Sequence, residues 1–246
     1  MAKRAFSRFR ALRSEPYFIS IEGEAILMSE ETTQAVPRSL PRMNEPAPDF
    51  TAQTTHGPLT LSSLKGKWVV LFSHPADFTP VCTTELVEFA RRAPDFEKLN
   101  VQLLGLSIDS VYSHIAWARS MEQHFGVKIP YPMIADLDTK VAMLYGMLHP
   151  GASSTATVRC VFVIDDKGMV RAMIYYPLTN GRSVDEIVRL VTALQTTDKN
   201  GVATPCNWQP GEKVIVPAPL TTEGADKRMQ DSSVEATDWY FSKKSL

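Results

Sequence analysis

Short apolar stretches alternate with amphipathic stretches over most of this chain, and this alternation limits the folds available to it. Continuous apolar residues at 67–73 and 101–108 predict two buried strands. Apolar residues at helical spacing follow each of them, at 79–99 and at 110–125. Strands and helices that alternate in this way pack as layers, with the helices covering the sheet. The sequence therefore predicts an α/β domain.

The second half of the pattern contains a hairpin and a last long helix. Strands are predicted at 158–164 and 170–176, joined by a short turn that ends in Gly168. A short helix at 136–145 precedes the hairpin, and a helix at 183–196 follows it. The expected fold class is α/β with a central mixed sheet flanked by helices.

Changes in composition divide the chain into three parts. Residues 28–48 are polar and rich in proline, which is typical of a lead-in rather than a packed element. We therefore expect a mobile N-terminal extension at 1–42 and the main folded domain at 43–197. Proline and glycine then interrupt short apolar runs, so residues 198–246 are expected to form a smaller C-terminal domain or arm.

The first residues of the chain are basic. Five lysines and arginines precede Glu15, the first acidic residue. We interpret this segment as a basic arm, or as an extension upstream of a second start at Met28. We expect a cytoplasmic protein, and targeting to an organelle by an arginine-rich transit segment is the alternative. A membrane span is not expected, because no stretch has the roughly 18 consecutive apolar residues that it needs.

The composition excludes several classes of function. The formal net charge of −1 gives no reason to expect a polyanionic partner, and without a groove-reading motif we expect no nucleic-acid binding. The three cysteines are an odd number and widely spaced, which argues against a disulfide framework. No CxxC motif and no zinc-ligand spacing occur, so neither a dithiol oxidoreductase nor a metal site is expected. A reducing setting fits best, with at least one cysteine kept for chemistry.

Cys82 is the strongest candidate for that chemistry. The chain leaves the strand at 67–73, passes through a loop with two prolines, and reaches Cys82 as the next helix begins. Thr79 followed by Pro80 is typical of a helix start, which places Cys82 at the third helical position. There the sulfur is expected near unpaired backbone N–H groups and the positive end of the helix dipole. Both favour a thiolate, the nucleophilic form of cysteine.

The helix alone does not account for a reactive thiol. The dipole contributes about 0.3–1 kcal/mol, and up to ~2 kcal/mol when the site is partly buried. A cation close to the sulfur is therefore expected as well. The alternative is a buried, unreactive thiol, the common state of a free cysteine. The helix-start position, the neighbouring hydroxyls and nearby His74 weigh against that alternative.

The residues around Cys82 resemble a known active-site signature. Residues 75–82 read Pro-Ala-Asp-Phe-Thr-Pro-Val-Cys and match the P-x-x-x-T/S-x-x-C signature of peroxiredoxins. With the similar segments at 175–182, 203–208 and 238–241, the resemblance is to the long-tailed 1-Cys class and its archaeal relatives. It covers roughly residues 43–241. It implies a thioredoxin-like fold, a C-terminal dimerisation arm, and reduction of peroxides without a metal or an organic cofactor.

The resemblance also implies catalytic roles for four residues. Cys82 would be the peroxidatic nucleophile, which attacks a peroxide oxygen and becomes a sulfenic acid. Arg159 would be the missing cation, stabilising the thiolate and polarising the peroxide. The hydroxyl of Thr79 would accept from the peroxide and donate to the thiolate, and Pro75 would shield the pocket from water.

Three supporting positions follow from the same resemblance. His74 is expected beside the sulfur, where it would orient or stabilise oxidised forms; the alternative is an ordinary packed histidine. Arg182 resembles a second family arginine that supports the site, the alternative being a surface charge. Glu85 is expected to hold an arginine in place, and simple charge complementarity in the first helical turn is its alternative.

The sequence leaves open how oxidised Cys82 is reduced. Archaeal relatives often carry cysteines near the C-terminus, but Ala236 and Ser242 stand at those places here. Cys160 follows Arg159 on a strand, so its side chain is expected on the opposite face and is interpreted as structural. Cys206 is the remaining candidate for a resolving cysteine. We favour a 1-Cys mechanism with an external thiol or dithiol reductant, such as a thioredoxin-like protein or glutathione.

Together these features predict a thiol peroxidase that reduces hydrogen peroxide and organic hydroperoxides in antioxidant defence and redox homeostasis. The resemblance implies a homodimer that assembles into a higher ring. One alternative is a 2-Cys mechanism with Cys206 as the resolving cysteine. Another is a holdase chaperone of the same fold with secondary peroxidase activity.

Overall fold

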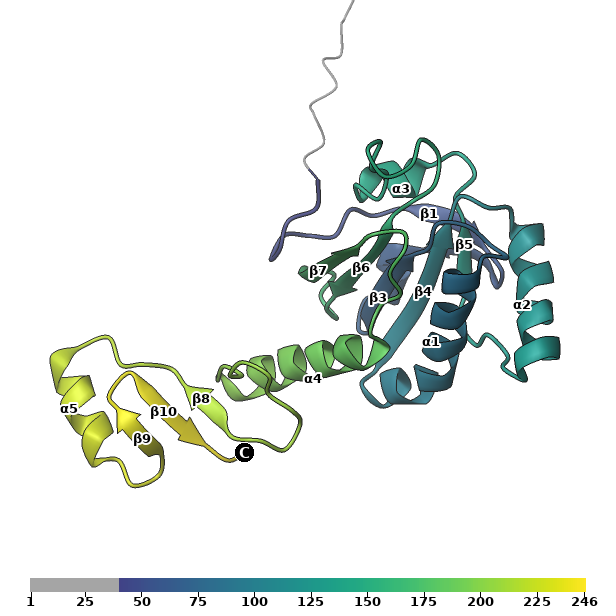
Figure 1. The fold of residues 1–246 in the computed structure, drawn as a ribbon. Coiled ribbons are helices and arrows are strands. Elements are labelled where there is room, and N and C mark those ends of the chain that lie inside the picture. Colours follow the sequence, from purple (N-terminus) through teal and green to yellow (C-terminus); the bar gives the residue numbers. More distant parts are fainter. Residues whose placement is uncertain (1–39) are drawn as a thin grey trace, which may run out of the picture. The chain divides into compact units, whose positions relative to one another are not determined.

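The computed structural model of the protein describes residues 40–246. A seven-stranded sheet lies at its centre, in the order β2-β1-β5-β4-β3-β6-β7 (Figure 1). Its strands are β1 (Thr51–Thr54), β2 (Gly57–Thr60), β3 (Trp68–Ser73), β4 (Val101–Ser107), β5 (Met133–Ala135), β6 (Arg159–Ile164) and β7 (Val170–Tyr176). Strands β3, β4 and β5 are parallel, whereas β6 and β7 join antiparallel. The mixed sheet confirms the predicted fold class.

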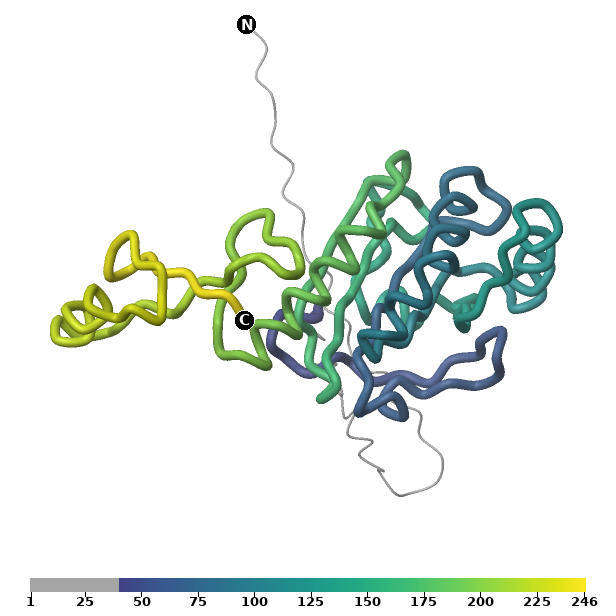
Figure 2. Tube along the Cα trace, turned by 90° about the horizontal axis from the view of Figure 1, so that it is seen from below, coloured from purple at the N-terminus to yellow at the C-terminus, as the bar shows by residue number. Residues whose placement is uncertain are grey.

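Helices cover both faces of this sheet. They are α1 (Pro80–Lys98), α2 (Val111–Phe125), α3 (Lys140–Leu144), α4 (Val184–Asn200) and the short 3-10 helix η1 (Leu61–Leu64). Helices α1, α2 and α4 pack on one face, and α1 and α4 lie next to each other (Figure 2). Helix α3 and η1 pack on the other face. Because β3 is covered on both sides, all six of its residues are buried.

Two core clusters on opposite faces of the sheet follow from strand alternation. Val70 and Phe72 of β3 point into the cluster under α1, α2 and α4. Val69 and Leu71 point into the cluster that includes α3. Cys82 belongs to the first cluster and Cys160 to the second. The two buried cysteines therefore lie on different sides of the sheet.

Several elements differ from the sequence-based expectations. The hairpin of β1 and β2 and the three-residue strand β5 were not expected, since they are short and carry no clear alternation. The predicted helix at 136–145 is shorter, because the carboxylate of Asp136 accepts from the N–H groups of Val141 and Ala142 and so precedes the helical turn. Helix α4 continues four residues beyond the predicted end at 196, to Asn200, and Gly201 with φ 60° is its C-cap.

The C-terminal residues form a second, smaller sheet. It has the order β8-β10-β9, with β8 (Val214–Val216), α5 (Thr222–Gln230), β9 (Glu235–Asp238) and β10 (Phe241–Lys244). A small apolar cluster of Ala193, Val202, Trp208 and Val214 joins the end of α4 to this region. Helix α4 thus crosses the boundary expected between residues 197 and 198.

The expectations for the N-terminal segment and for a membrane span concern different parts of the chain. The basic N-terminal arm, its targeting alternative and the second start at Met28 lie outside the described residues. Within residues 40–246, no helix combines the length and the apolar character needed to cross a membrane.

Candidate active site

Cys82 is the third residue of α1 and is completely buried. Thr79 is the N-cap residue with extended backbone, and Pro80 occupies the first helical position. The side chain of Thr79 makes no capping bond, however, because its hydroxyl donates to the carbonyl of Ala76 at 2.8 Å. The hydroxyl of Thr79 therefore does not occupy the backbone N–H groups in the first turn of α1.

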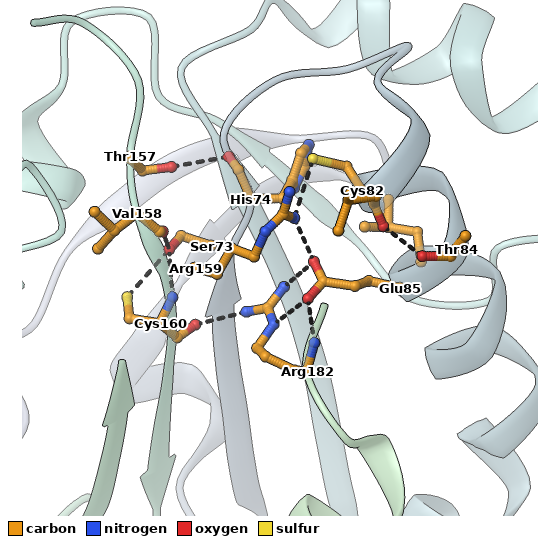
Figure 3. A network of polar contacts seen from close by, with 12 residues as sticks. Ser73, His74, Cys82, Thr84, Glu85, Thr157, Val158, Arg159, Cys160 and Arg182 are labelled. Atoms are coloured by element: carbon orange, nitrogen blue, oxygen red, sulfur yellow. Dashed lines mark hydrogen bonds and ion pairs between the residues drawn. The ribbon is translucent and has the colours of Figure 1, made fainter. Parts of the chain in front are cut away.

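Arg159 supplies a cation at the sulfur. Its Nη1 donates to Cys82 Sγ at 3.3 Å and to Glu85 Oε2 at 2.7 Å (Figure 3). Its Nε and Nη2 both donate to the carbonyl of Leu178, at 2.9 and 2.8 Å. The side chain is 3% exposed, so these four bonds hold a buried guanidinium in one orientation.

Glu85 joins two arginines. Its Oε1 accepts from the backbone N–H and from Nε of Arg182, both at 2.8 Å. Its Oε2 accepts from Arg159 Nη1 and Arg182 Nη2, both at 2.7 Å. Burial opposes ionisation of this carboxyl, but the hydrogen bonds and charge of Arg182 and the charge of Arg159 outweigh it and lower the pKa of Glu85. The expected role of Glu85, to hold an arginine, therefore applies to both.

Arg182 is a buried member of this network and not a surface charge. Its Nη1 donates to the carbonyl of Cys160 at 2.9 Å, which ties the network to β6. Its guanidinium also lies over the rings of Phe72 and Phe89, at 5.5 and 5.7 Å from their centres. These contacts hold Arg182, and through Glu85 they also hold Arg159.

The buried groups beside Cys82 Sγ carry one excess positive charge. Arg159 and Arg182 bring two positive charges, and Glu85 brings one negative charge. A buried unit with one excess positive charge is costly, so a neighbouring anion is stabilised. Cys82 Sγ is the atom placed to carry that anion. This gives a physical reason for a thiolate that does not depend on the helix dipole.

His74 and Pro75 lie in the loop that leads from β3 to α1. His74 is completely buried, and its Nε2 bonds to Asp77 Oδ1 at 2.9 Å. Burial lowers the pKa of His74, even though Asp77 acts in the opposite direction. His74 is thus a buried histidine with one hydrogen-bonded ring nitrogen, and its role beside the sulfur stays a prediction. Pro75 and Thr79 are half-buried in the same loop.

The two other cysteines differ sharply from Cys82. Cys160 is fully buried on the opposite face, 3.1 Å from the hydroxyl of Ser73. Burial raises the pKa of this thiol to about 11. Cys206 is exposed, in the connection between α4 and β8. All three are free thiols.

Two buried side chains received no role from the sequence. Asp77 lies within the signature, and His114 on α2 bonds to Asp77 Oδ2 at 2.8 Å. The burial of His114 could have been predicted from the sequence, because His114, Trp117 and Met121 are spaced so that they share one helical face. A polar residue on such a face needs a buried partner.

Two family models match the chain. The AhpC/TSA family matches residues 43–173, and the C-terminal domain of 1-Cys peroxiredoxin matches residues 193–232. Among curated proteins, a peroxiredoxin of Aquifex aeolicus is 58% identical over 219 residues, which cover 85% of this chain and 98% of that protein. Peroxiredoxin 2 of Thermoplasma acidophilum is 54% identical over 199 residues, with 81% and 98% covered.

Solved structures show the same likeness. A yeast mitochondrial 1-Cys peroxiredoxin, studied for thiol resolution via glutathione/thioredoxin systems, superimposes with a TM-score of 0.75 at 41% identity, covering 83% of this chain and 99% of that one. Peroxiredoxin 6 of Arenicola marina gives a TM-score of 0.75 at 35% identity, with 83% and 98% covered.

Proposed function

Because the chain belongs to the AhpC/TSA family and is a peroxiredoxin, a thiol peroxidase, we propose that Cys82 is the sulfur that attacks the peroxide. The single observation that carries this proposal is the 3.3 Å contact between Arg159 Nη1 and Cys82 Sγ. It joins a buried cation to a buried sulfur at a helix N-terminus, where a thiolate is favoured.

The reaction that these residues support is a displacement at oxygen. The Cys82 thiolate attacks one peroxide oxygen, the S–O bond forms, and the O–O bond breaks. Cys82 becomes a sulfenic acid, and the leaving hydroxide or alkoxide takes up a proton to give water or an alcohol. Arg159 stabilises the negative charge as it moves from sulfur to the leaving oxygen.

The loop before α1 shapes the place where the peroxide binds. Since the proton of the Thr79 hydroxyl is directed to Ala76, we assign Thr79 only the acceptor role, toward the O–H of the peroxide. Pro75 has no N–H to offer and limits the access of water. Hydrogen peroxide and organic hydroperoxides are the proposed substrates.

We propose a 1-Cys mechanism for the step that follows. Cys82 is fully buried and Cys206 is exposed, so nothing in the described chain brings the two sulfurs together within one subunit. An external thiol or dithiol, such as glutathione or a thioredoxin-like protein, would then reduce the sulfenic acid. Cys206 acting across a dimer is the alternative.

The C-terminal residues support a proposal about assembly. Trp239, Tyr240 and Phe241 are 42%, 58% and 39% exposed and follow one another in the chain. We assign residues 198–246 to a dimerisation domain in which such a patch is covered by a second copy, with rings as the larger assembly. Three free thiols fit a reducing compartment, and we propose the cytoplasm.

The assignment of Cys82 is tested by comparing Cys82→Ser with Cys160→Ser. We expect Cys82→Ser to lose peroxide consumption by on the order of a thousandfold or more, because the nucleophile is gone. Cys160→Ser should keep most of the activity. A Cys82→Ser protein that still consumes hydrogen peroxide with a thiol reductant would overturn the proposal.

Mass spectrometry after one equivalent of peroxide separates the two routes of reduction. A sulfenic acid on Cys82, trapped with dimedone in the absence of reductant, is the expected result. A disulfide between Cys82 and Cys206 that links two subunits, and that disappears in Cys206→Ser, would replace the 1-Cys mechanism.

A further inference from the structure

Three buried side chains, two from the loop between β3 and α1 and one from α2, form a hydrogen-bonded triad. Asp77 uses both carboxylate oxygens, with His74 Nε2 at 2.9 Å and His114 Nδ1 at 2.8 Å. The other ring nitrogen of His114, Nε2, lies 3.0 Å from the carbonyl oxygen of Ile134. All three side chains are at most 1% exposed. Because water does not reach these side chains, their polar atoms need hydrogen-bond partners within the protein.

The partners determine how many protons the triad holds. The carbonyl of Ile134 can only accept, so His114 Nε2 carries a proton. Each of the two bonds to Asp77 needs one proton more. Three protons on two imidazoles and one carboxyl give no net charge. The triad is therefore a neutral buried unit, which avoids the cost of an unpaired charge.

The hydrogen-bond partners place these protons. Burial opposes ionisation of Asp77, but the hydrogen bonds from His114 and His74 outweigh it and lower the pKa of Asp77. An ionised carboxylate only accepts, so both bonds to it are donated, by Nδ1 of His114 and by Nε2 of His74. A second proton on His74 would lie on Nδ1, which has no acceptor within residues 40–246, and burial also lowers the pKa of His74. We therefore assign His74 a single proton, on Nε2.

One atom of the triad remains unused. Among residues 40–246, His74 Nδ1 is buried and has no hydrogen-bond partner. Because the proton of His74 is on Nε2, Nδ1 presents a bare lone pair and can only accept. His74 belongs to the loop that also carries Pro75 and Thr79, and Figure 3 draws it with the network around Cys82, which it joins by its backbone carbonyl, the acceptor of the Thr157 hydroxyl.

We propose that His114 is a positioning residue of the peroxidase site, which acts through Asp77 to hold His74 in the tautomer whose Nδ1 is an acceptor. The acceptor can take a hydrogen bond from the O–H of a peroxide, or from the sulfenic acid formed on Cys82. This inference rests on the proposed role of Cys82. Besides the members of the triad, the charged group that faces it is Asp109, whose carboxylate accepts from the backbone N–H of Asp77 at 3.0 Å.

The same three side chains carry ligand atoms that a metal ion uses, and this is the competing interpretation. The distances favour hydrogen bonds, since 2.8 and 2.9 Å between nitrogen and oxygen are ordinary lengths for a shared proton. In addition, both carboxylate oxygens and both nitrogens of His114 already have partners.

The proton positions can be measured directly on reduced protein. Replacing exposed His56, His124 and His149 by glutamine leaves His74 and His114 as the only histidines. In ¹⁵N imidazole spectra at neutral pH we expect one ring protonated on both nitrogens and one protonated only on Nε2. A proton on His74 Nδ1, or a single proton on His114, would overturn the proposal. Because these spectra are recorded without peroxide, they can contradict the proposal for His114 without contradicting the proposed role of Cys82.

Two substitutions of His114 separate positioning from packing. In His114→Asn the amide lies near the former Nδ1 and can still donate to Asp77. In His114→Gln it reaches toward the former Nε2 and Ile134, so Asp77 loses a donor, takes up a proton, and donates it to His74 Nε2. The proton of His74 then moves to Nδ1.

We expect His114→Gln to lower kcat/KM for hydrogen peroxide by roughly tenfold to a hundredfold, with the His74 tautomer reversed. We expect His114→Asn to lose less activity than His114→Gln, because its amide still donates to Asp77 although the charge of His114 is gone. His124→Gln, on the exposed face of the same helix, is the control. Equal losses in the two variants with an unchanged His74 tautomer would show a packing role and overturn the proposal. If neither variant folds, the spectra of the protein with His114 intact decide.

Discussion

Cys82 and Cys160 are the same residue type with the same burial, yet their surroundings are opposite. Both are 0% exposed, and they lie in core clusters on the two faces of the sheet. The sulfur of Cys82 lies 3.3 Å from a guanidinium nitrogen of Arg159. The sulfur of Cys160 lies 3.1 Å from the hydroxyl of Ser73, and burial raises the pKa of its thiol to about 11. Burial alone therefore does not distinguish the two sulfurs; the nearby charge does.

A single strand creates this difference. Arg159 and Cys160 are consecutive in β6, so their side chains point to opposite faces of the sheet. Arg182 contacts both sides, but it reaches Cys160 only at the backbone carbonyl. On the other side it bonds to Glu85, which also holds Arg159. Arg159 is thus directed toward the sulfur of Cys82, whereas the sulfur of Cys160 contacts a neutral hydroxyl.

The largest expected effect comes from removing the carboxylate that holds both arginines. Glu85→Gln leaves two buried guanidinium groups without their anion, so we expect the free energy of unfolding to fall by about 3–5 kcal/mol. Urea unfolding of the reduced protein measures this change. Glu88→Gln, a partly exposed carboxylate on the same helix, is the matched control and should change little.

Removing the cation itself should act on the rate. Arg159→Met keeps much of the side-chain length but takes away the charge beside Cys82 Sγ. We expect kcat/KM for hydrogen peroxide to fall by about 10²–10³-fold, as for the loss of a donor that stabilises developing negative charge. Arg91→Met, which removes an exposed arginine of α1, provides the control. If Arg159→Met reacts as fast as the original protein, the charge contrast between the two cysteines is not the cause of reactivity.

Stability at acidic pH should depend on the network at Cys82. The pKa of Glu85 is lowered in the folded protein, so the unfolded chain binds its proton first as the pH falls. Glu85 therefore stabilises the folded protein fully at pH values above 4.5, the ordinary pKa of a glutamate. This stabilisation is lost as the pH falls through the lowered pKa of Glu85 in the folded protein. Asp77 acts in the same direction.

Unfolding free energies measured from neutral pH down to about pH 3 check this sign. We expect a steeper loss in the original protein than in Glu85→Gln, which retains only the contribution of Asp77 and weaker groups. Equal slopes would show that Glu85 is not held as a buried carboxylate.

The smallest effect is expected at the other cysteine. Cys160→Ala removes one buried sulfur and should cost about 1 kcal/mol of stability through a small cavity. The Ser73 hydroxyl still donates to the carbonyl of Val158 at 2.5 Å, so no donor is left unpaired. Peroxidase activity should stay within about twofold, since no charge near Cys82 changes. A loss as large as that of Arg159→Met would remove the distinction between the two faces.

Local patterns in the sequence were sufficient for much of the fold. The strand before the loop, the helix start at Pro80 and the third-position cysteine follow from apolar runs and from a proline at a tolerated position. Of the apolar residues in the helix predicted at 110–125, Trp117 and Met121 are buried. Ile115, another apolar residue of this helix, is 38% exposed. The buried position next to it belongs to His114, because Asp77 and Ile134 provide its partners.

The sequence by itself therefore determined where Cys82 is presented, at a helix start after a buried strand, since helix starts and strands depend on neighbouring residues. Only the tertiary structure decided what surrounds the sulfur. Arg159 is 77 positions from Cys82, Arg182 is 97 from Glu85, and His114 is 37 from Asp77. Residues so far apart in the chain meet only when β6, α2 and the start of α4 pack around α1. The charges beside Cys82 and the hydrogen bonds of Asp77 arise from that packing.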